Sequence, residues 1–178
     1  MEIFLKQWWV WLCVLVQLCD ICPESKAYFT PKDDLTGLCL AMINAEKKSI
    51  HGAIYMFTDK KIAQALIEAK KRGVDVQIIL DQISMISCGK GKLLQENGIP
   101  VLVHRTEGFN PYTMALMHHK FFIFGCNHDS KSWLWTGSWN CTLRASAHND
   151  ENVIVLDDAG LITQYTDYFT QLQARLEA

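Results

Sequence analysis

The chain has 178 residues, of which 49% are hydrophobic and 20% charged, close to the average for soluble globular domains. This composition argues against a disordered chain and a multi-span membrane protein. The length suits one domain with at most a short appendage, and it argues against a two-lobed enzyme. The formal net charge is -2, and residues 26–178 contain equal numbers of acidic and basic side chains. Any anion site must therefore be local, because the chain lacks the basic excess of many nucleic-acid-binding proteins.

An apolar run at residues 8–18 (WWVWLCVLVQL) follows Lys6 and ends before Asp20. It is shorter than the roughly 20 residues that span a bilayer as a helix, and no small-residue cleavage site follows it. Its three tryptophans favour a membrane interface. We predict that residues 1–25 are a membrane anchor or a signal segment, with an apolar helix packed on the domain as the alternative. The protein is then membrane-anchored or exported, periplasmic or extracytoplasmic, and residues 27–178 form its domain.

Seven cysteines are present, and their spacing indicates no regular framework. Cys19 and Cys22 form a C-x-x-C pair, but no second pair exists to complete a zinc ribbon. Cys39, Cys126 and Cys141 lie in apolar surroundings, where a buried free thiol is expected. The redox compartment stays open.

Helix-like and strand-like segments alternate from Ala27 onward. Capping aspartates and apolar spacing predict helices at about 33–48, 59–72 and 90–97. Strands are predicted at 49–58, 74–80 and 100–104 from their β-branched and aromatic residues. A helix between two such strands implies a right-handed parallel crossover.

The second half of the chain changes pattern. Three strand candidates, at 117–124, 132–136 and 151–157, have no long helices between them, so this part of the sheet is predicted to be mixed or antiparallel. A last helix at about 159–176 is predicted to bury Leu161, Ile162, Tyr165, Phe169 and Leu172. The fold class is therefore α/β, with a mixed, mostly parallel central sheet flanked by helices.

Five of the six histidines lie between residues 104 and 148, which directs attention to the segment MHHKFFIF. In a strand, His118 and Lys120 point to one face and His119 to the other. An imidazole beside an ammonium group can attack or protonate a phosphate while the lysine neutralises its oxygens. The alternative is a strand-end histidine next to a solvated lysine.

A second polar segment, TGSWNCT at 136–142, follows the next strand candidate. Its glycine allows close approach of a ligand to the backbone, and Ser138 and Asn140 offer hydrogen-bond donors to phosphate oxygens. The alternative is an ordinary turn whose side chains bond their own backbone. Farther along, Glu151 could accept a hydrogen bond from the far nitrogen of His118 and fix its tautomer.

Three short motifs thus occur in a fixed order, each on or directly after a strand. They are His118-x-Lys120, Gly137-Ser138-x-Asn140 and Glu151-Asn152. Over residues 27–176 this set resembles the phospholipase D superfamily and its HKD motif. The passage 65–81 (ALIEAKKRGVDVQIILD) is also similar to the small bacterial Nuc-type endonucleases and the mitochondrial Zucchini-type members, which have one motif per chain.

The resemblance implies a phospholipase D-like fold with one lobe per chain, and a phosphodiesterase. His118 would be the nucleophile that forms a phosphohistidine, and His118 of a second copy would be the general acid. Lys120, Ser138 and Asn140 would bind the phosphate, while Glu151 would orient a histidine. No metal or other cofactor would take part, because covalent attack replaces a metal-activated hydroxide. Since one chain supplies one such histidine, a homodimer is expected.

The sequence departs from the family pattern at one position. The motif is H-x-K-x4-D, and Gly125 stands where the aspartate is expected. Asp129 could substitute only if the chain bulged, so we expect weaker support of the site with both reactive groups retained. A zinc site from Cys126, His128 and His148 is disfavoured by their irregular spacing.

The sequence leaves two substrate classes open. The Nuc-like resemblance favours DNA or RNA, whereas the apolar N-terminus favours membrane phospholipids such as cardiolipin. A catalytically weak nucleic-acid-binding or membrane-binding member is the third alternative. Cations that could contact a nucleic-acid backbone are Lys70, Lys71, Arg72, Lys90, Lys92, Arg105 and Arg144. Aromatic residues that could stack on bases, or simply pack in the core or rim, are Phe109, Tyr112 and Trp139.

Overall fold

The computed structural model describes residues 25–86, 88–106 and 115–178. The predicted anchor or signal segment therefore lies outside the described residues, apart from Ser25. Phe109 and Tyr112 also lie outside them. Among the described residues, no helix is long and apolar enough to cross a membrane.

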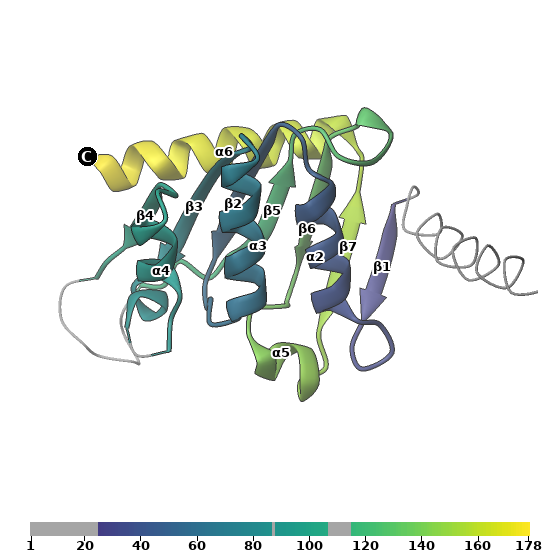
Figure 1. Cartoon of the computed structure of the whole chain (residues 1–178), viewed down its shortest axis with the longest axis horizontal. Helices are drawn as coiled ribbons and strands as arrows, with labels where there is room; N and C mark the ends of the chain where they lie inside the picture. Colours follow the sequence, from purple (N-terminus) through teal and green to yellow (C-terminus); the bar gives the residue numbers. More distant parts are fainter. Residues whose placement is uncertain (1–24, 87, 107–114) are drawn as a thin grey trace, which may run out of the picture.

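The centre of the fold is one seven-stranded sheet with the order β1-β7-β6-β5-β2-β3-β4 (Figure 1). Its strands are β1 (Lys26–Phe29), β2 (Ser49–Ile54), β3 (Asp75–Asp81), β4 (Val101–His104), β5 (Lys120–Phe124), β6 (Trp133–Gly137) and β7 (Asn152–Leu156). β2 pairs in parallel with β3, and β3 with β4. The other four pairs are antiparallel.

These pairings confirm the mixed α/β sheet and correct one detail of it. The expectation of a mostly parallel sheet is wrong, because only the β2–β3 and β3–β4 pairs are parallel. The connection from β5 to β6 is too short for a parallel crossover, and the short helix α5 (Leu143–Ala147) between β6 and β7 lies at one edge of the sheet instead of crossing a face (Figure 1). β1 (Lys26–Phe29), which was not predicted, adds a further antiparallel pair at the edge.

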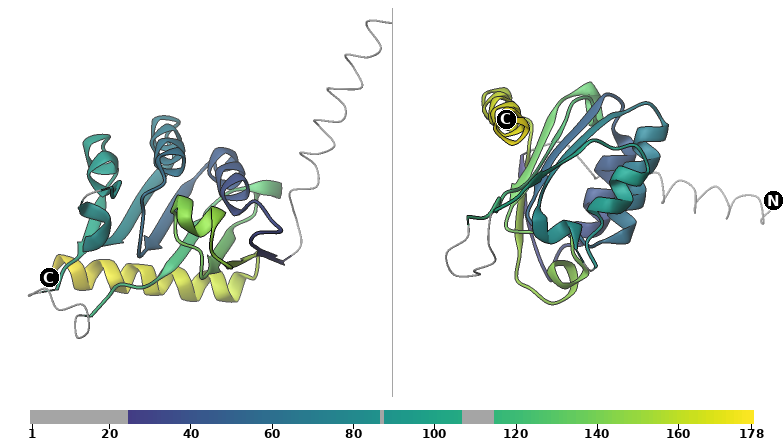
Figure 2. Two further views of the ribbon diagram at one scale, coloured as in Figure 1. Left: turned by 90° about the horizontal axis from the view of Figure 1, so that it is seen from below. Right: turned by 90° about the vertical axis from the view of Figure 1, so that its left-hand side faces the viewer.

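Helices cover both faces of the sheet. They are α2 (Leu35–Ala45), α3 (Lys60–Lys71), α4 (Gly91–Glu96), α5 (Leu143–Ala147) and α6 (Ala159–Glu177), with short 3-10 turns η1 (Gln82–Met85) and η2 (His128–Ser130). Figure 2 shows α2, α3 and α4 on one face and α6 alone along the other. The domain is thus a three-layer sandwich.

The predicted caps account for where the first two helices begin. The Asp34 carboxylate accepts a hydrogen bond from the Gly37 N–H, and Asp59 accepts from Lys61 and Ile62. Each bond satisfies a backbone donor that has no partner within the helix. Asp158 begins α6 in the same way.

The alternation of side chains along the strands produces two apolar layers. The larger one packs α2 and α3 on the sheet around Trp133, Trp135 and Phe122. The smaller one places α6 on the opposite face through Phe169 and Leu172, as predicted. Leu161 is 41% exposed, so its predicted burial is wrong: it lies beside the stripe of α6 that starts at Ile162 and faces the sheet.

Candidate active site

All five side chains predicted for the site come to one end of the sheet. β5 runs antiparallel to both β2 and β6, so its beginning lies beside the carboxyl ends of these two strands. Lys120 pairs with Ile54 at the end of β2, and Gly137 at the end of β6 pairs with Val153 near the start of β7. We call this edge, which also contains α5 and is the lower edge in Figure 1, the site end of the sheet.

His118 and Lys120 are in direct contact on the same face, as the strand periodicity predicts. The Lys120 ammonium donates a hydrogen bond to His118 Nδ1 at 3.1 Å and another to the His118 carbonyl oxygen at 2.6 Å. Because an ammonium group has no lone pair, Nδ1 is the acceptor, and in the neutral ring Nε2 bears the proton. Lys120 thus fixes both the orientation and the tautomer of the imidazole.

His119 points to the other face. Its Nε2 lies 2.9 Å from the Tyr168 hydroxyl, and its ring packs edge-on against Tyr168 of α6. One of the two adjacent histidines is therefore used to pack α6 on the sheet, and only His118 faces the site.

Tyr55, which sequence reasoning missed, lies on top of this pair. Its ring centroid is 4.5 Å from that of His118, and the Lys120 ammonium lies 5.3 Å from the tyrosine ring centroid. A cation over an aromatic face is attracted by the ring quadrupole. The available signal was weak: a tyrosine directly after a strand has many structural explanations.

Burial and charge both act on the reactive groups. Burial lowers the pKa of His118, the nearby Lys120 charge lowers it further, and Asp81 opposes them. Burial also lowers the pKa of Lys120, against the attraction of Glu151. A histidine kept neutral beside an ammonium group is suited to nucleophilic attack on an anionic phosphorus centre.

Ser138 and Glu151 form the second part of the site. The Ser138 hydroxyl donates to Glu151 Oε2 and accepts the Asn152 N–H at 3.0 Å. Asn149 donates to Glu151 Oε1 at 2.9 Å. A Cβ on Gly137 would lie 2.1 Å from the Asn152 carbonyl oxygen, so only glycine allows β6 and β7 to approach this closely. Within the described part of one chain, Glu151 makes no hydrogen bond to His118.

The unpredicted strand β1 supports this carboxylate. Thr30, directly after β1, accepts the Glu151 N–H at 2.7 Å and donates to the Asn149 carbonyl oxygen. The four residues of β1 (KAYF) do not alternate between apolar and polar, so sequence periodicity could not predict this strand. Its role depends on the contacts of Thr30 with residues about 120 positions later in the chain.

Asn140 and Trp139 follow in the same loop. The Asn140 side-chain oxygen accepts the Met56 N–H at 3.1 Å, which fixes the plane of the amide at the end of β2. Trp139 is 1% exposed and donates to Ser146, so core packing rather than base stacking is confirmed for it.

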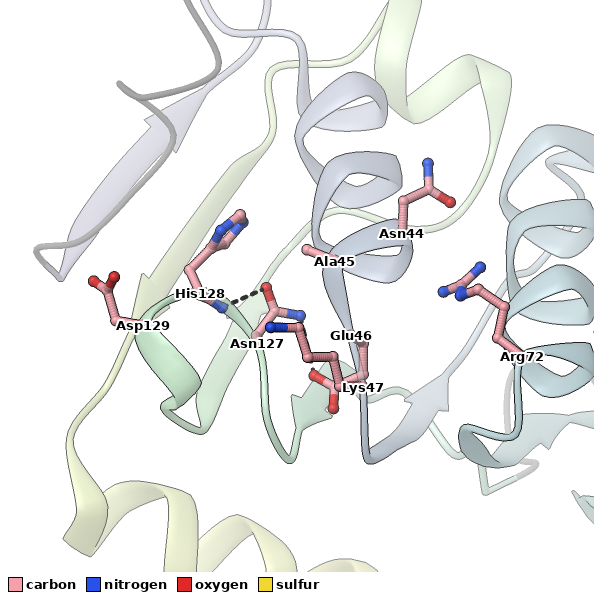
Figure 3. A pocket seen from close by; sticks show the side chains of 8 residues that line it. All are labelled: Asn44, Ala45, Glu46, Lys47, Arg72, Asn127, His128 and Asp129. Atoms are coloured by element: carbon pink, nitrogen blue, oxygen red, sulfur yellow. Dashed lines mark hydrogen bonds between the residues drawn. The ribbon is translucent and has the colours of Figure 1, made fainter. Parts of the chain in front are cut away.

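Gly125, the departure from the motif, lies at the opposite end of β5 from Lys120. Its N–H donates to the Ser49 carbonyl oxygen at 2.9 Å, and a Cβ here would lie 2.2 Å from the Ser49 hydroxyl. Asp129 is exposed and adopts a left-handed backbone, with φ of 52°. Figure 3 shows its side chain directed away from Glu46 and Asn127. Asp129 therefore does not replace the motif aspartate.

Glu46 supplies the carboxylate at this end instead. It is 2% exposed, and its Oε1 accepts N–H groups from Lys48, Ser49 and Cys126, while Oε2 accepts the Asn127 amide. One buried side chain thus joins the start of β2 to the end of β5. Sequence reasoning missed it because nothing in the order of residues marks a glutamate at a helix end as a cross-strand acceptor.

The candidate cations separate into two groups. One group lies toward the site end, beside or directly after elements that end there: Lys90, Lys92, Arg105 and Arg144. Lys70, Lys71 and Arg72 instead end α3 at the far side of the sheet. The far group fits the alternative of a solvated, dipole-favoured helix terminus.

No group of three or more His, Cys, Asp or Glu side chains able to hold a metal ion occurs in the described residues, Cys126, His128 and His148 included. Cys39 and Cys141 are buried free thiols, as predicted, while Cys126 is only half-buried.

Comparison with known proteins identifies the family. Residues 39–173 match the family described as "Cardiolipin synthase, PLD-like domain". The chain belongs to the phospholipase D superfamily. It is 33% identical over 148 residues to a phospholipase D of Rickettsia bellii, covering 83% of this chain and 68% of that protein. It is 28% identical over 136 residues to a mitochondrial cardiolipin hydrolase of Xenopus tropicalis, covering 76% of this chain and 59% of that protein.

A solved structure of a phospholipase D family member, Nuc from Salmonella typhimurium, has the same fold. It superposes with a TM-score of 0.69 at 27% identity and covers 84% of this chain and 93% of Nuc. This superfamily member thus spans nearly all of Nuc, but only about three fifths to two thirds of the cardiolipin hydrolase and the phospholipase D.

We expect that Glu46→Ala lowers the free energy of unfolding by about 2–4 kcal/mol, because it leaves several buried N–H donors without an acceptor. Urea denaturation followed by circular dichroism measures this. The control Glu96→Ala removes an exposed glutamate from α4 and should change the free energy by less than about 0.5 kcal/mol. Equal unfolding midpoints for the two variants would contradict the structural role of Glu46.

We expect the His118 imidazole to titrate with a midpoint below 6.5, its ordinary value, because burial and Lys120 both disfavour the charged ring. The fraction of His118 in the neutral form then rises as the pH passes through a midpoint below 6.5. Proton NMR of the imidazole, assigned with His118→Ala, measures this midpoint. Lys120→Met removes the nearby charge and should move the midpoint upward, and a downward movement would contradict this explanation.

Proposed function

We propose that this protein is a metal-independent phosphodiesterase that acts through a phosphohistidine on His118. The observation that supports this most is the His118–Lys120 contact at 3.1 Å, placed at the same end of the sheet as Ser138, Asn140 and Glu151. Membership of a superfamily that includes phospholipase D relatives supports hydrolysis of a phosphodiester bond. A single catalytic histidine per chain supports a two-copy site.

The proposed reaction has two displacements. A nitrogen of the neutral His118 ring attacks phosphorus, so that an N–P bond forms as the P–O bond to the leaving group breaks. The leaving oxygen takes a proton from the protonated His118 of a second copy. Water then attacks phosphorus and gives a proton to the second histidine. The N–P bond breaks as the new P–O bond forms, so the first ring becomes neutral again and the second is protonated again. Atoms and protons balance without an added metal.

The resting contact between Lys120 and His118 fits this scheme. In the chain alone, the ammonium group occupies His118 Nδ1. An arriving phosphate offers oxygens that are stronger acceptors, because an ionised acceptor shortens and strengthens the hydrogen bond. Lys120 would then move its donors to the phosphate and release Nδ1, which can take up the proton and leave the Nε2 lone pair for attack. Glu151, close enough to raise the pKa of Lys120, is the proposed carboxylate that orients a histidine.

The second lobe is proposed to be another copy of the chain. Four large apolar side chains are exposed around the site end, and apolar surface left in water marks a place where another surface binds. These side chains are Phe29 at 52%, Ile86 at 60%, Leu116 at 43% and Leu143 at 68% exposure. Pairing two copies at this end would bury such residues and bring two His118 rings to one phosphate across a two-fold axis.

Nucleic acid is the first substrate class that we propose. Lys90, Arg105 and Arg144 lie toward the site end, and pairing two copies would double the number of cations around one cleft. The near-zero total charge limits affinity and long-range steering more than it limits the reaction itself.

Membrane phospholipid is the second class, and two observations favour it. The exposed apolar residues around the site could also contact a lipid surface. The relatives at 33% and 28% identity are named for phospholipids, a phospholipase D and a cardiolipin hydrolase. A protein that only binds these ligands is disfavoured, because the complete set of His118, Lys120 and Glu151 would then have no use.

We expect the full-length protein to hydrolyse a phosphodiester in EDTA, and His118→Ala to lower kcat at least about a thousandfold through loss of the nucleophile. Single-stranded DNA, RNA and cardiolipin vesicles are the three substrates to compare. His119→Gln is the matched control, since this neighbour faces α6, and it should retain activity. Light scattering should give the same two-copy mass for all three proteins.

Two outcomes would contradict the proposal. Turnover that requires an added divalent metal would exclude the covalent mechanism, and substantial hydrolysis by His118→Ala would exclude His118 as the nucleophile. Hydrolysis of cardiolipin in vesicles without cleavage of DNA or RNA would make phospholipid, and not nucleic acid, the substrate class.

A further inference from the structure

Asp81 is a buried carboxylate that the proposed reaction does not use. It is the last residue of β3 and is 1% exposed. Its Oδ1 accepts the Ile83 N–H at 3.1 Å and begins the turn η1, while its Oδ2 accepts the Met117 N–H at 3.1 Å. A buried carboxylate bonded to two backbone donors is rigidly held, because breaking either bond would leave a buried charge less satisfied.

The bond to Met117 matters because the next residue in the chain is His118. Residues 115–119 precede β5 and have no regular strand pairing. His118 is nevertheless held between two contacts: the Met117 N–H donates to Asp81, and the His119 carbonyl oxygen accepts the Tyr55 N–H at 2.8 Å. The backbone on either side of the candidate nucleophile is therefore tied to the ends of two neighbouring strands, β3 and β2.

A second imidazole lies behind Asp81. His104 pairs with Asp81 across the parallel strands β3 and β4, and its Nδ1 lies 3.6 Å from Asp81 Oδ2. This nitrogen is buried and has no hydrogen-bond partner among the described residues. The arrangement places Asp81 between two histidines, one packed beside it and one reached through the Met117 backbone.

We propose that Asp81 is a positioning residue for His118: its carboxylate, backed by His104, fixes the backbone that presents the imidazole to the phosphate. This inference rests on the proposed function. A nucleophile must be held within a few tenths of an ångström of its productive position, and a rigid supporting contact provides this.

Electrostatics point the same way as the geometry. The titratable and charged groups around His118 are Lys120 at the start of β5, Asp81 at the end of β3, Tyr55 directly after β2 and His119 on the other face. Asp81 acts against burial and Lys120, so it keeps the His118 pKa from falling further. Removal of its charge should move the titration of His118 to lower pH.

Three variants test the proposal in the full-length protein. Asp81→Asn keeps the shape and one acceptor but removes the charge, and Asp81→Ala removes both. The control is Asp75→Asn at the other end of β3, where the exposed Asp75 bonds to His51 at 3.2 Å and lies away from His118. Thermal unfolding establishes that each variant is folded.

The expected results separate positioning from mere stability. Asp81→Asn should lower the NMR midpoint of His118, whereas Asp75→Asn should leave it unchanged. With bis(p-nitrophenyl) phosphate as the probe, Asp81→Ala should lower kcat about tenfold or more with KM altered less than about threefold, and Asp81→Asn should lie between it and the wild type. Hydrogen exchange of the Met117 amide should speed up in Asp81→Ala.

The proposal is overturned if both Asp81 variants match Asp75→Asn in His118 midpoint, kcat and Met117 exchange. A loss of thermal stability alone, with the same three readouts unchanged, also overturns it. If the wild-type protein hydrolyses no phosphodiester, the proposed function fails. The His118 midpoint and the Met117 exchange then still decide whether Asp81 holds this backbone.

Discussion

The antiparallel insertion of β5 between β2 and β6 is the constraint on which the site depends. Because β5 runs opposite to both neighbours, its first residue, Lys120, lies where the other two strands end. This single reversal brings the segment before β5, the loop after β6 and the residue before β7 to one edge. A parallel β5 would place Lys120 at the far side of the sheet from Ser138, and no phosphate could contact both.

Two buried carboxylates hold β5 in this place, one near each end. Glu46 bonds the residues that follow the strand, and Asp81 bonds the segment that precedes it. The departure from the motif at Gly125 is thus confined to the end away from the reactive groups, where Ser49 lies against the glycine and Glu46 accepts the N–H of the next residue, Cys126. The chemistry requires His118 and Lys120 in contact, and neither side chain touches Gly125.

Local rules predicted much of this molecule, and contacts between distant residues explain what they missed. Aspartate caps placed two helices correctly, and the period of two separated His118 from His119 on opposite faces. Tyr55 and Asp81 were missed because their roles come from neighbours that the fold supplies. The expectation of a mostly parallel sheet failed because the helical crossovers of the first half of the chain account for only two strand pairs, and the other four pairs are antiparallel. The five motif side chains were predicted as a set, since each has a polar or nucleophilic group near a strand end.

The covalent intermediate tests the central claim most directly. Rapid acid-free quenching of the full-length protein with a labelled phosphodiester, followed by peptide mass spectrometry, measures phosphorylation of individual histidines. We predict an acid-labile, base-stable phosphoryl adduct on the peptide containing His118 and none in His118→Ala. Turnover without any adduct on His118, or an adduct that persists in His118→Ala, would contradict the covalent mechanism.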